Sequence, residues 1–141
     1  MTALNGVRVI DFSWVGAGSF TTRLLAEHGA DVVKVESATH VDSLRLGPPF
    51  AEGIPGVNRS GYFAERNANK KSVALNLKDP RGVEIARGLI ADADVVANNF
   101  RPGVMANLGL GYDELRAINP RIIYLSMSMQ GDTGPESAYS G

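Results

Sequence analysis

Short apolar runs alternate along the chain with longer segments in which apolar residues recur every three to four positions. The short runs have the length and composition of buried β-strands, and they cover residues 7–12, 32–36, 72–77, 94–97 and 121–126. The longer segments follow the period of an α-helix and lie between the runs. Strands and helices that alternate at this spacing predict an α/β fold: a mostly parallel sheet of about five strands with helices on both faces.

Glycine, proline and capping residues mark the ends of the predicted helices. The first helix is expected over residues 17–28, with Phe20, Leu24 and Leu25 on one face and Gly29 as its stop signal. The other helices are predicted at residues 61–66, from Pro80 with the apolar positions Val83, Ala86, Leu89 and Ile90, and from Asp113 as the cap of a helix that holds Leu115 and Ile118.

The carboxyl edge of the predicted sheet is where a ligand is expected, because parallel sheets bind ligands beyond the carboxyl ends of their strands. That edge would gather residues 13–18, 36–39, 78–79 and 98–103. Residues 37–60 show neither a strand-like apolar run nor the helical period. A segment of that length without regular structure is more often functional or mobile than a plain connector.

Composition narrows the function classes without choosing among them. A chain of 141 residues fits one domain, and its net charge of −1 gives no general attraction to nucleic acid or to an anionic membrane. The absence of cysteine excludes disulfides, thiolate catalysis and cysteine-ligated metals. His28 and His40 lack metal-ligand spacing, so no metal is expected. With neither a leader-like start nor an apolar stretch of membrane-spanning length, the expected location is cytoplasmic.

Residues 98–112 hold the first candidate site, since they follow a strand and lead into a short helix. Pro102 suits the first helical position and Gly109 the C-terminal cap. Arg101 would then lie beside the unpaired N–H groups of the helix start, where an anion is favoured. An ordinary strand-to-helix turn with a solvated arginine explains the same residues.

Gly16 and Gly18 follow the first strand, and Glu36 comes about twenty residues later, as in a dinucleotide-binding fingerprint. The third glycine of that fingerprint is Thr21 here, so small residues that permit a tight turn and close helix packing explain the pattern better. Asp11 and Glu36 would either meet as paired carboxylates or cap loops and helix ends.

Lysines flank the third strand at Lys70, Lys71 and Lys78. They are either solvated charges at the strand ends or contacts for a phosphate-bearing ligand. Trp14, directly after the first strand, would either wall a pocket or pack in the core. No serine has a base and orienting partner at a recognisable spacing.

Seven segments in fixed order carry a family resemblance. They are LNGVRVIDF (residues 4–12), LLAEHGADVVKVE (24–36), NKKSVALNLK (69–78), ADVVANNFRPG (93–103), LGLGY (108–112), INPRIIY (118–124) and GDTGP (131–135). Together they resemble the N-terminal portion of the family III CoA-transferases, which include formyl-CoA transferase, the carnitine CoA-transferase group and α-methylacyl-CoA racemase.

The resemblance implies that residues 1–141 are the Rossmann-like, CoA-binding region of a longer enzyme that forms an interlocked homodimer. Such an enzyme would move CoA from an acyl-CoA to a carboxylic acid through an aspartyl intermediate. The aspartate would lie beyond Gly141, so no residue here is expected to be catalytic, and this piece alone is expected to be inactive. A racemase of the same family, a free dinucleotide-binding domain and a non-catalytic interaction module remain alternatives.

Counterparts of the CoA contacts of the family are implied in three segments of this sequence. They are Gly16 and Ala17 after the first strand, Leu75 and Lys78 near the third, and Asn99, Phe100 and Arg101 after the fourth.

Three positions depart from the family pattern. Gly16 replaces a glutamine of the formyl-CoA transferases, which argues against that substrate class. Ser37 and Asn107 replace arginines, which would weaken phosphate binding unless another cation compensates. The candidates for that compensation are Arg23, Arg45, Lys70 and Lys71.

Overall fold

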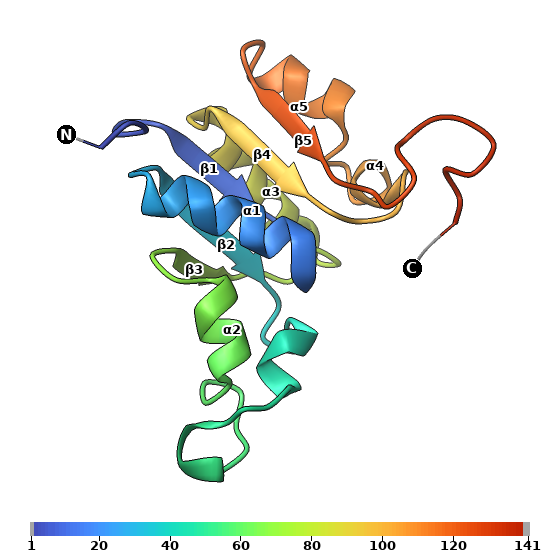
Figure 1. The fold of residues 1–141 in the computed structure, drawn as a ribbon. Helices are drawn as coiled ribbons and strands as arrows, with labels where there is room; N and C mark the ends of the chain where they lie inside the picture. The colour runs from blue at the N-terminus through green and yellow to red at the C-terminus, as the bar shows by residue number, and fades with distance from the viewer. Residues whose placement is uncertain (1, 140–141) are drawn as a thin grey trace.

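Five parallel strands form one sheet at the centre of the molecule. The computed structural model describes residues 2–139. The strands are β1 (Arg8–Asp11), β2 (Asp31–Glu36), β3 (Lys71–Ala74), β4 (Val95–Asn98) and β5 (Ile123–Ser126), in the order β3-β2-β1-β4-β5. All four pairings are parallel, which confirms the predicted α/β class (Figure 1).

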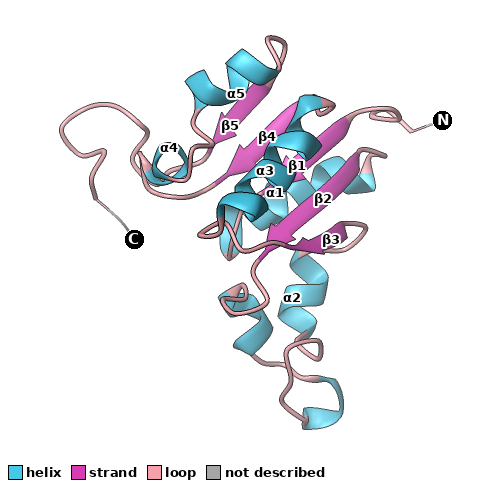
Figure 2. Cartoon of the chain, turned by 180° about the vertical axis from the view of Figure 1, so that it is seen from behind, coloured by secondary structure: helices cyan, strands magenta, loops and turns pink. Residues whose placement is uncertain are grey.

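Helices cover both faces of this sheet, as expected for a parallel sheet (Figures 1 and 2). On one face, α1 (Gly16–Glu27) buries Ala26 against Val9 and Val32. On the other face, α3 (Pro80–Ala91) and α5 (Tyr112–Ile118) cover the larger hydrophobic cluster. Successive residues of a strand therefore pack into opposite cores, and for this reason the strands appear in the sequence as short apolar runs.

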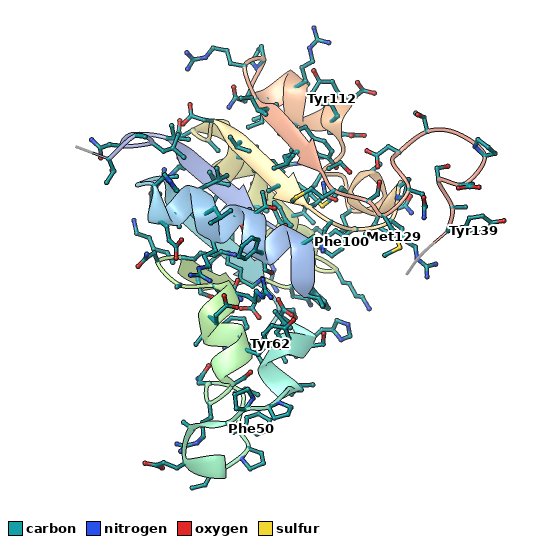
Figure 3. The ribbon with its side chains drawn as sticks, viewed as in Figure 1. Phe50, Tyr62, Phe100, Tyr112, Met129 and Tyr139 are labelled. Carbon is teal, nitrogen blue, oxygen red and sulfur yellow. The ribbon has the colours of Figure 1, made fainter. Side chains whose placement is uncertain are left out.

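Residues 37–66 form a lobe beside the β3 edge of the sheet (Figure 1). Two short 3-10 helices, Ser43–Leu46 and Ala51–Gly53, interrupt what was expected to be an irregular segment. The predicted single turn is α2 (Gly61–Arg66), and Ser60 caps it by accepting a hydrogen bond from the Phe63 N–H. Tyr62 and Phe50 lie in this lobe, away from the sheet (Figure 3).

The helix starts after β4 were predicted wrongly. The short helix is α4 (Val104–Asn107), so Pro102 lies in the turn before it, and Gly103 is its N-cap in the left-handed region (φ 84°). The next helix, α5, has Gly111 at its N-cap, and Asp113 lies inside its first turn. Gly109, with φ 70°, does end α4 as expected.

The buried face of α1 also differs from the prediction. Phe20 and Leu24 are 38% and 39% exposed, whereas the residues against the sheet are small or polar. Those buried residues are Gly18, Ser19, Thr22 and Ala26.

In the part of the chain that the structure describes, no helix is long and apolar enough to cross a membrane.

Candidate functional site

A pocket of about 580 Å³ opens at the carboxyl edge of the sheet. Its walls come from the segments that follow β1, β2, β3 and β4, which is where parallel sheets bind ligands. The order β3-β2-β1-β4-β5 reverses direction at the β1–β4 pair, so this pocket lies beside the topological switch point. The lining residues are Phe12, Trp14, Val35, Glu36, Ser37, Thr39, His40, Leu75, Asn76, Leu77, Lys78, Phe100, Val104 and Leu108.

Three of the seven residues carried over from the family line this pocket: Leu75, Lys78 and Phe100. Lys78 also lines an adjoining pocket of about 820 Å³, which includes Arg87 and Asn107. The third strand stops at Ala74, and the predicted strand 72–77 was therefore too long at its end. Because β3 stops there, Leu75 to Lys78 are free to turn across the edge.

Aromatic rings form one wall of the pocket. Trp14 was left open between pocket wall and core, and it lines the pocket. Its ring lies 5.1 Å from the His40 ring and 6.2 Å, edge-on, from the Phe100 ring. Figure 3 shows Phe100 beyond the tip of β4. Such a wall offers flat apolar faces on which a planar ring could stack.

Asn99 joins the turn after β1 to the turn after β4. Its side-chain oxygen accepts a hydrogen bond from the Trp14 N–H at 2.8 Å, and its Nδ2 donates to the Trp14 carbonyl at 2.7 Å. Asn99 therefore holds the main chain of the aromatic wall, and it is not among the residues that line the pocket. Its expected role as a ligand contact stays a prediction.

Gly16 and Ala17 begin α1, and the two glycines of this helix start differ in their surroundings. A Cβ at Gly16 would meet nothing within 4 Å. A Cβ at Gly18 would lie 2.5 Å from the Ser13 Cβ, so close packing of helix on turn explains that glycine. This favours the structural explanation of the Gly16 and Gly18 pair over the dinucleotide fingerprint.

Arg101 lies at a separate, smaller pocket of about 220 Å³, whose lining includes Tyr112, Tyr124 and Asp132. The helix that follows it has only four residues, Val104–Asn107, and begins two residues later than predicted. The dipole of so short a helix therefore contributes little to the binding of an anion at Arg101. Binding of a phosphate by Arg101 stays a prediction.

Lys70 is not solvated, and it is not among the residues that line the pocket. Its side chain is 1% exposed, and its Nζ donates at 2.9 Å to the Asp11 carboxylate. Two further bonds of 2.9 Å run to the Ser19 carbonyl and the Asn67 side chain. Burial lowers the pKa of Lys70, and the neighbouring Asp11 carboxylate opposes that shift.

Glu36 also forms an ion pair, with Arg45. Arg45 forms two hydrogen bonds to its carboxylate, at 2.7 and 2.9 Å. Burial raises the pKa of Glu36, but the Arg45 guanidinium and the Asp42 N–H more than offset this, so the pKa lies below its usual value. Asp11 and Glu36 are thus in separate ion pairs, and they do not meet as paired carboxylates.

The cations proposed to compensate for Ser37 and Asn107 all pair with carboxylates. Arg23 bonds Glu27 and Glu65, and Lys71 bonds Asp31 at the amino-terminal edge of the sheet. With Lys70 and Arg45 also paired, Lys78 is the lysine that the structure brings to the pocket. Within residues 2–139, no group of three or more His, Asp or Glu side chains could hold a metal ion.

A third buried pair, between Lys34 and Asp42, was not predicted from the sequence. Their charged atoms are 3.1 Å apart, and the two side chains are 1% and 0% exposed. Lys34 sits inside an apolar run and Asp42 inside the irregular segment, so neither period nor spacing connects them. A charged residue in the middle of a buried strand was the one available signal.

Comparison with known proteins agrees with this architecture. The profile of CoA-transferase family III matches residues 4–141. A CAIB/BAIF family protein from Brucella suis superposes with a TM-score of 0.89 at 39% identity, over 99% of this chain and 37% of that chain.

Two relatives carry names for particular acids. Succinyl-CoA:glutarate CoA-transferase of Mus musculus is 45% identical over 100% of this chain and 31% of its own length. Formyl-CoA:oxalate CoA-transferase of Streptomyces coelicolor is 44% identical over 97% of this chain and 32% of its own length. The chain thus spans about a third of these relatives, and overall identity does not separate the two acid classes.

Proposed function

The chain belongs to CoA-transferase family III, and on that premise we propose that it binds CoA for an enzyme that moves CoA between an acyl-CoA and a carboxylic acid. The observation that carries the proposal is the pocket of about 580 Å³ at the carboxyl edge of the sheet. Its volume is in the range of small-molecule sites, and it combines aromatic walls with a lysine.

The lining suits the chemistry of CoA. The rings of Trp14 and Phe100 supply apolar faces for adenine, and Leu75 supplies an aliphatic contact. Lys78 lies between this pocket and the adjoining one, so its ammonium group can reach a phosphate in either. Gly16, Ala17 and Arg101 are further proposed contacts for parts of the cofactor that extend past the pocket.

The share of this chain in the proposed reaction is to hold and orient the thioester. Attack on the acyl carbon would come from an aspartate that the resemblance places after position 141, as covalent nucleophilic catalysis. Residues 1–141 would then act through binding, which fixes the reacting group relative to that nucleophile.

Titration of CoA against the intrinsic fluorescence of Trp14, the one tryptophan of the chain, tests the proposal. Lys78→Met is expected to weaken CoA binding by about tenfold, the equivalent of one charged hydrogen bond. Lys71→Met is the matched control, because Lys71 lies at the opposite edge of the sheet and pairs with Asp31. Pantetheine, which lacks the nucleotide phosphates, is expected to bind the wild type and Lys78→Met equally.

A thermal shift assay gives an independent readout, since a ligand that binds the native state raises the melting temperature. Millimolar CoA is expected to raise it, and Arg101→Ala is expected to remove the rise if Arg101 binds phosphate. No rise for the wild type would count against CoA binding by this chain. A rise lost in Lys78→Met but kept in Arg101→Ala would assign the phosphate contact to the pocket alone.

A further inference from the structure

The turn after β1 is held by side chains at every backbone polar group from the Ser13 N–H to the Val15 N–H. The Ser13 N–H donates to Asp11 at 2.9 Å, and the Ser13 carbonyl accepts from Lys34 at 2.6 Å. Both polar groups of Trp14 bond Asn99. The Val15 N–H donates to the Asp42 carboxylate at 3.2 and 3.3 Å.

Asp42 and Lys34 hold the two sides of Trp14 through one buried ion pair. Lys34 bonds the carbonyl before Trp14, and Asp42 bonds the N–H after it. The same carboxylate accepts the Leu44 N–H at 3.0 Å, so it is anchored in the lobe as well as in the turn. Neither charge reaches solvent.

Val15 shows that this turn is under strain. Its φ is 56° and its ψ −138°, and a β-branched residue at positive φ is an outlier. Such conformations persist where the surrounding structure over-determines them, and they cluster at functional sites. A buried ion pair is a poor source of stability compared with apolar packing, so its presence here points to a requirement of geometry.

The pair also joins two walls of the pocket. Ser37, Thr39 and His40 line it from the segment between Glu36 and Asp42, and Trp14 lines it from the turn. The Glu36 carboxylate accepts the Asp42 N–H at 3.2 Å, which closes that segment into a loop. Movement of Asp42 would therefore displace the Trp14 wall and the His40 wall together.

We propose that Asp42 and Lys34 are positioning residues, which hold the strained Ser13–Val15 turn and so set the Trp14 wall of the ligand pocket. The proposal rests on the proposed function to the extent that CoA is the ligand whose binding is measured. Held in place, the wall is formed before the ligand arrives. A loosened wall would lower the fraction of binding-competent molecules, and the apparent affinity falls by that fraction.

Asp42→Asn tests the proposal, because the amide can accept a hydrogen bond from Val15 or Leu44 but cannot pair with Lys34. Acrylamide quenching of Trp14 is expected to increase at least twofold, and the Kd for CoA is expected to rise by about tenfold or more. Ile90→Val is the matched control: Ile90 lies on the buried face of α3, so this change lowers the melting temperature without touching the turn. It is expected to leave quenching and Kd unchanged.

Two further measurements keep the test decisive. If Asp42→Asn does not fold, Lys34→Met/Asp42→Asn removes both charges and is expected to fold with the same loosened Trp14. Hydrogen exchange of the wild type needs no variant: the Val15 amide is expected to be protected nearly as well as the amides of β1.

Exchange of the Val15 amide at the rate of an open loop would overturn the proposal. So would a folded Asp42 variant with wild-type quenching and wild-type Kd. If the wild type does not bind CoA, the proposed function fails, while quenching and hydrogen exchange still decide the positioning role.

Discussion

Lys70→Met is expected to be among the most destabilising single changes outside the apolar core. The substitution keeps an apolar side chain of similar length and removes the charge. Lys70 donates three hydrogen bonds of 2.9 Å, to Asp11, Ser19 and Asn67, and the substitution removes all three. The Asp11 carboxylate, with no exposure to solvent, is left as an uncompensated buried charge.

The magnitude follows from what remains around Asp11. Breaking a buried ion pair by removing one partner costs about 3–5 kcal/mol. Asp11 keeps two donors, the Ser13 N–H at 2.9 Å and the Thr22 hydroxyl at 2.7 Å, so the lower end of that range is expected. A loss of about 3 kcal/mol is a large part of a total stability of about 5–15 kcal/mol.

Urea unfolding, followed by circular dichroism, measures this loss. With a slope m of about 1.5 kcal/mol/M, the midpoint is expected to fall by about 2 M without a change in m. Lys71→Met supplies the control in the adjacent residue, since Lys71 is 71% exposed and its pair with Asp31 is worth about 0–1 kcal/mol.

Two results would refute the reasoning. One is a cost for Lys70→Met within about 1 kcal/mol of that for Lys71→Met, which would mean that the pair is not buried in solution. The other concerns the double variant Asp11→Asn/Lys70→Met, which is expected to cost less than the sum of the two single changes, by about 0.5–3 kcal/mol. A cost equal to that sum would mean that the two residues do not interact.

Two further predictions concern glycines and acid. Gly18→Ala is expected to cost about 1–3 kcal/mol of stability, because the added methyl group overpacks the contact with Ser13. Gly88→Ala is expected to stabilise the protein by about 0.5–1 kcal/mol, because Gly88 lies on α3 with open space at its Cβ. Equal melting temperatures for the two variants would contradict this. Because the folded pKa of Glu36 is depressed, its stabilising contribution is present above the usual pKa of about 4.3 and is lost as the pH falls through the folded value. Arg45→Met is expected to flatten this acid limb of the stability profile, and an unchanged limb would refute the assignment.

The sheet could be predicted because its signals are local. The strands β1, β2 and β4 carry apolar residues on both faces, and that pattern marks them without knowledge of their neighbours. Glycines at positive φ, such as Gly29 and Gly109, ended helices where expected. The carboxyl edge was predicted for the same reason, since in a parallel sheet the direction of the chain determines which edge each strand end joins.

The charged interior could not be predicted, because its partners are brought together by strand order. Lys70 and Asp11 are 59 residues apart, and they meet only because β3 lies two strands from β1 and α1 passes over them. The same fact explains the error on α1. Thr22 faces the sheet because its hydroxyl donates to Asp11, and the neighbouring Ser19 carbonyl accepts from Lys70, which leaves Phe20 on the outside.

The buried charges lie beside the pocket, whereas part of the apolar core lies away from it, and this difference has a functional consequence. The cluster under α3 and α5 holds aliphatic side chains such as Ile90, Leu110 and Leu115. The three buried pairs, Lys70–Asp11, Lys34–Asp42 and Arg45–Glu36, surround the turn after β1 and the β2–lobe junction beside the pocket. An apolar edge could pack in several ways, whereas each ion pair has one partner and one geometry. Phe12, Val35 and Leu75 belong both to this cluster and to the pocket lining, whereas Ile90 belongs to the cluster alone. A change at Ile90 should therefore alter stability alone, while changes in the pairs should alter the shape of the pocket as well.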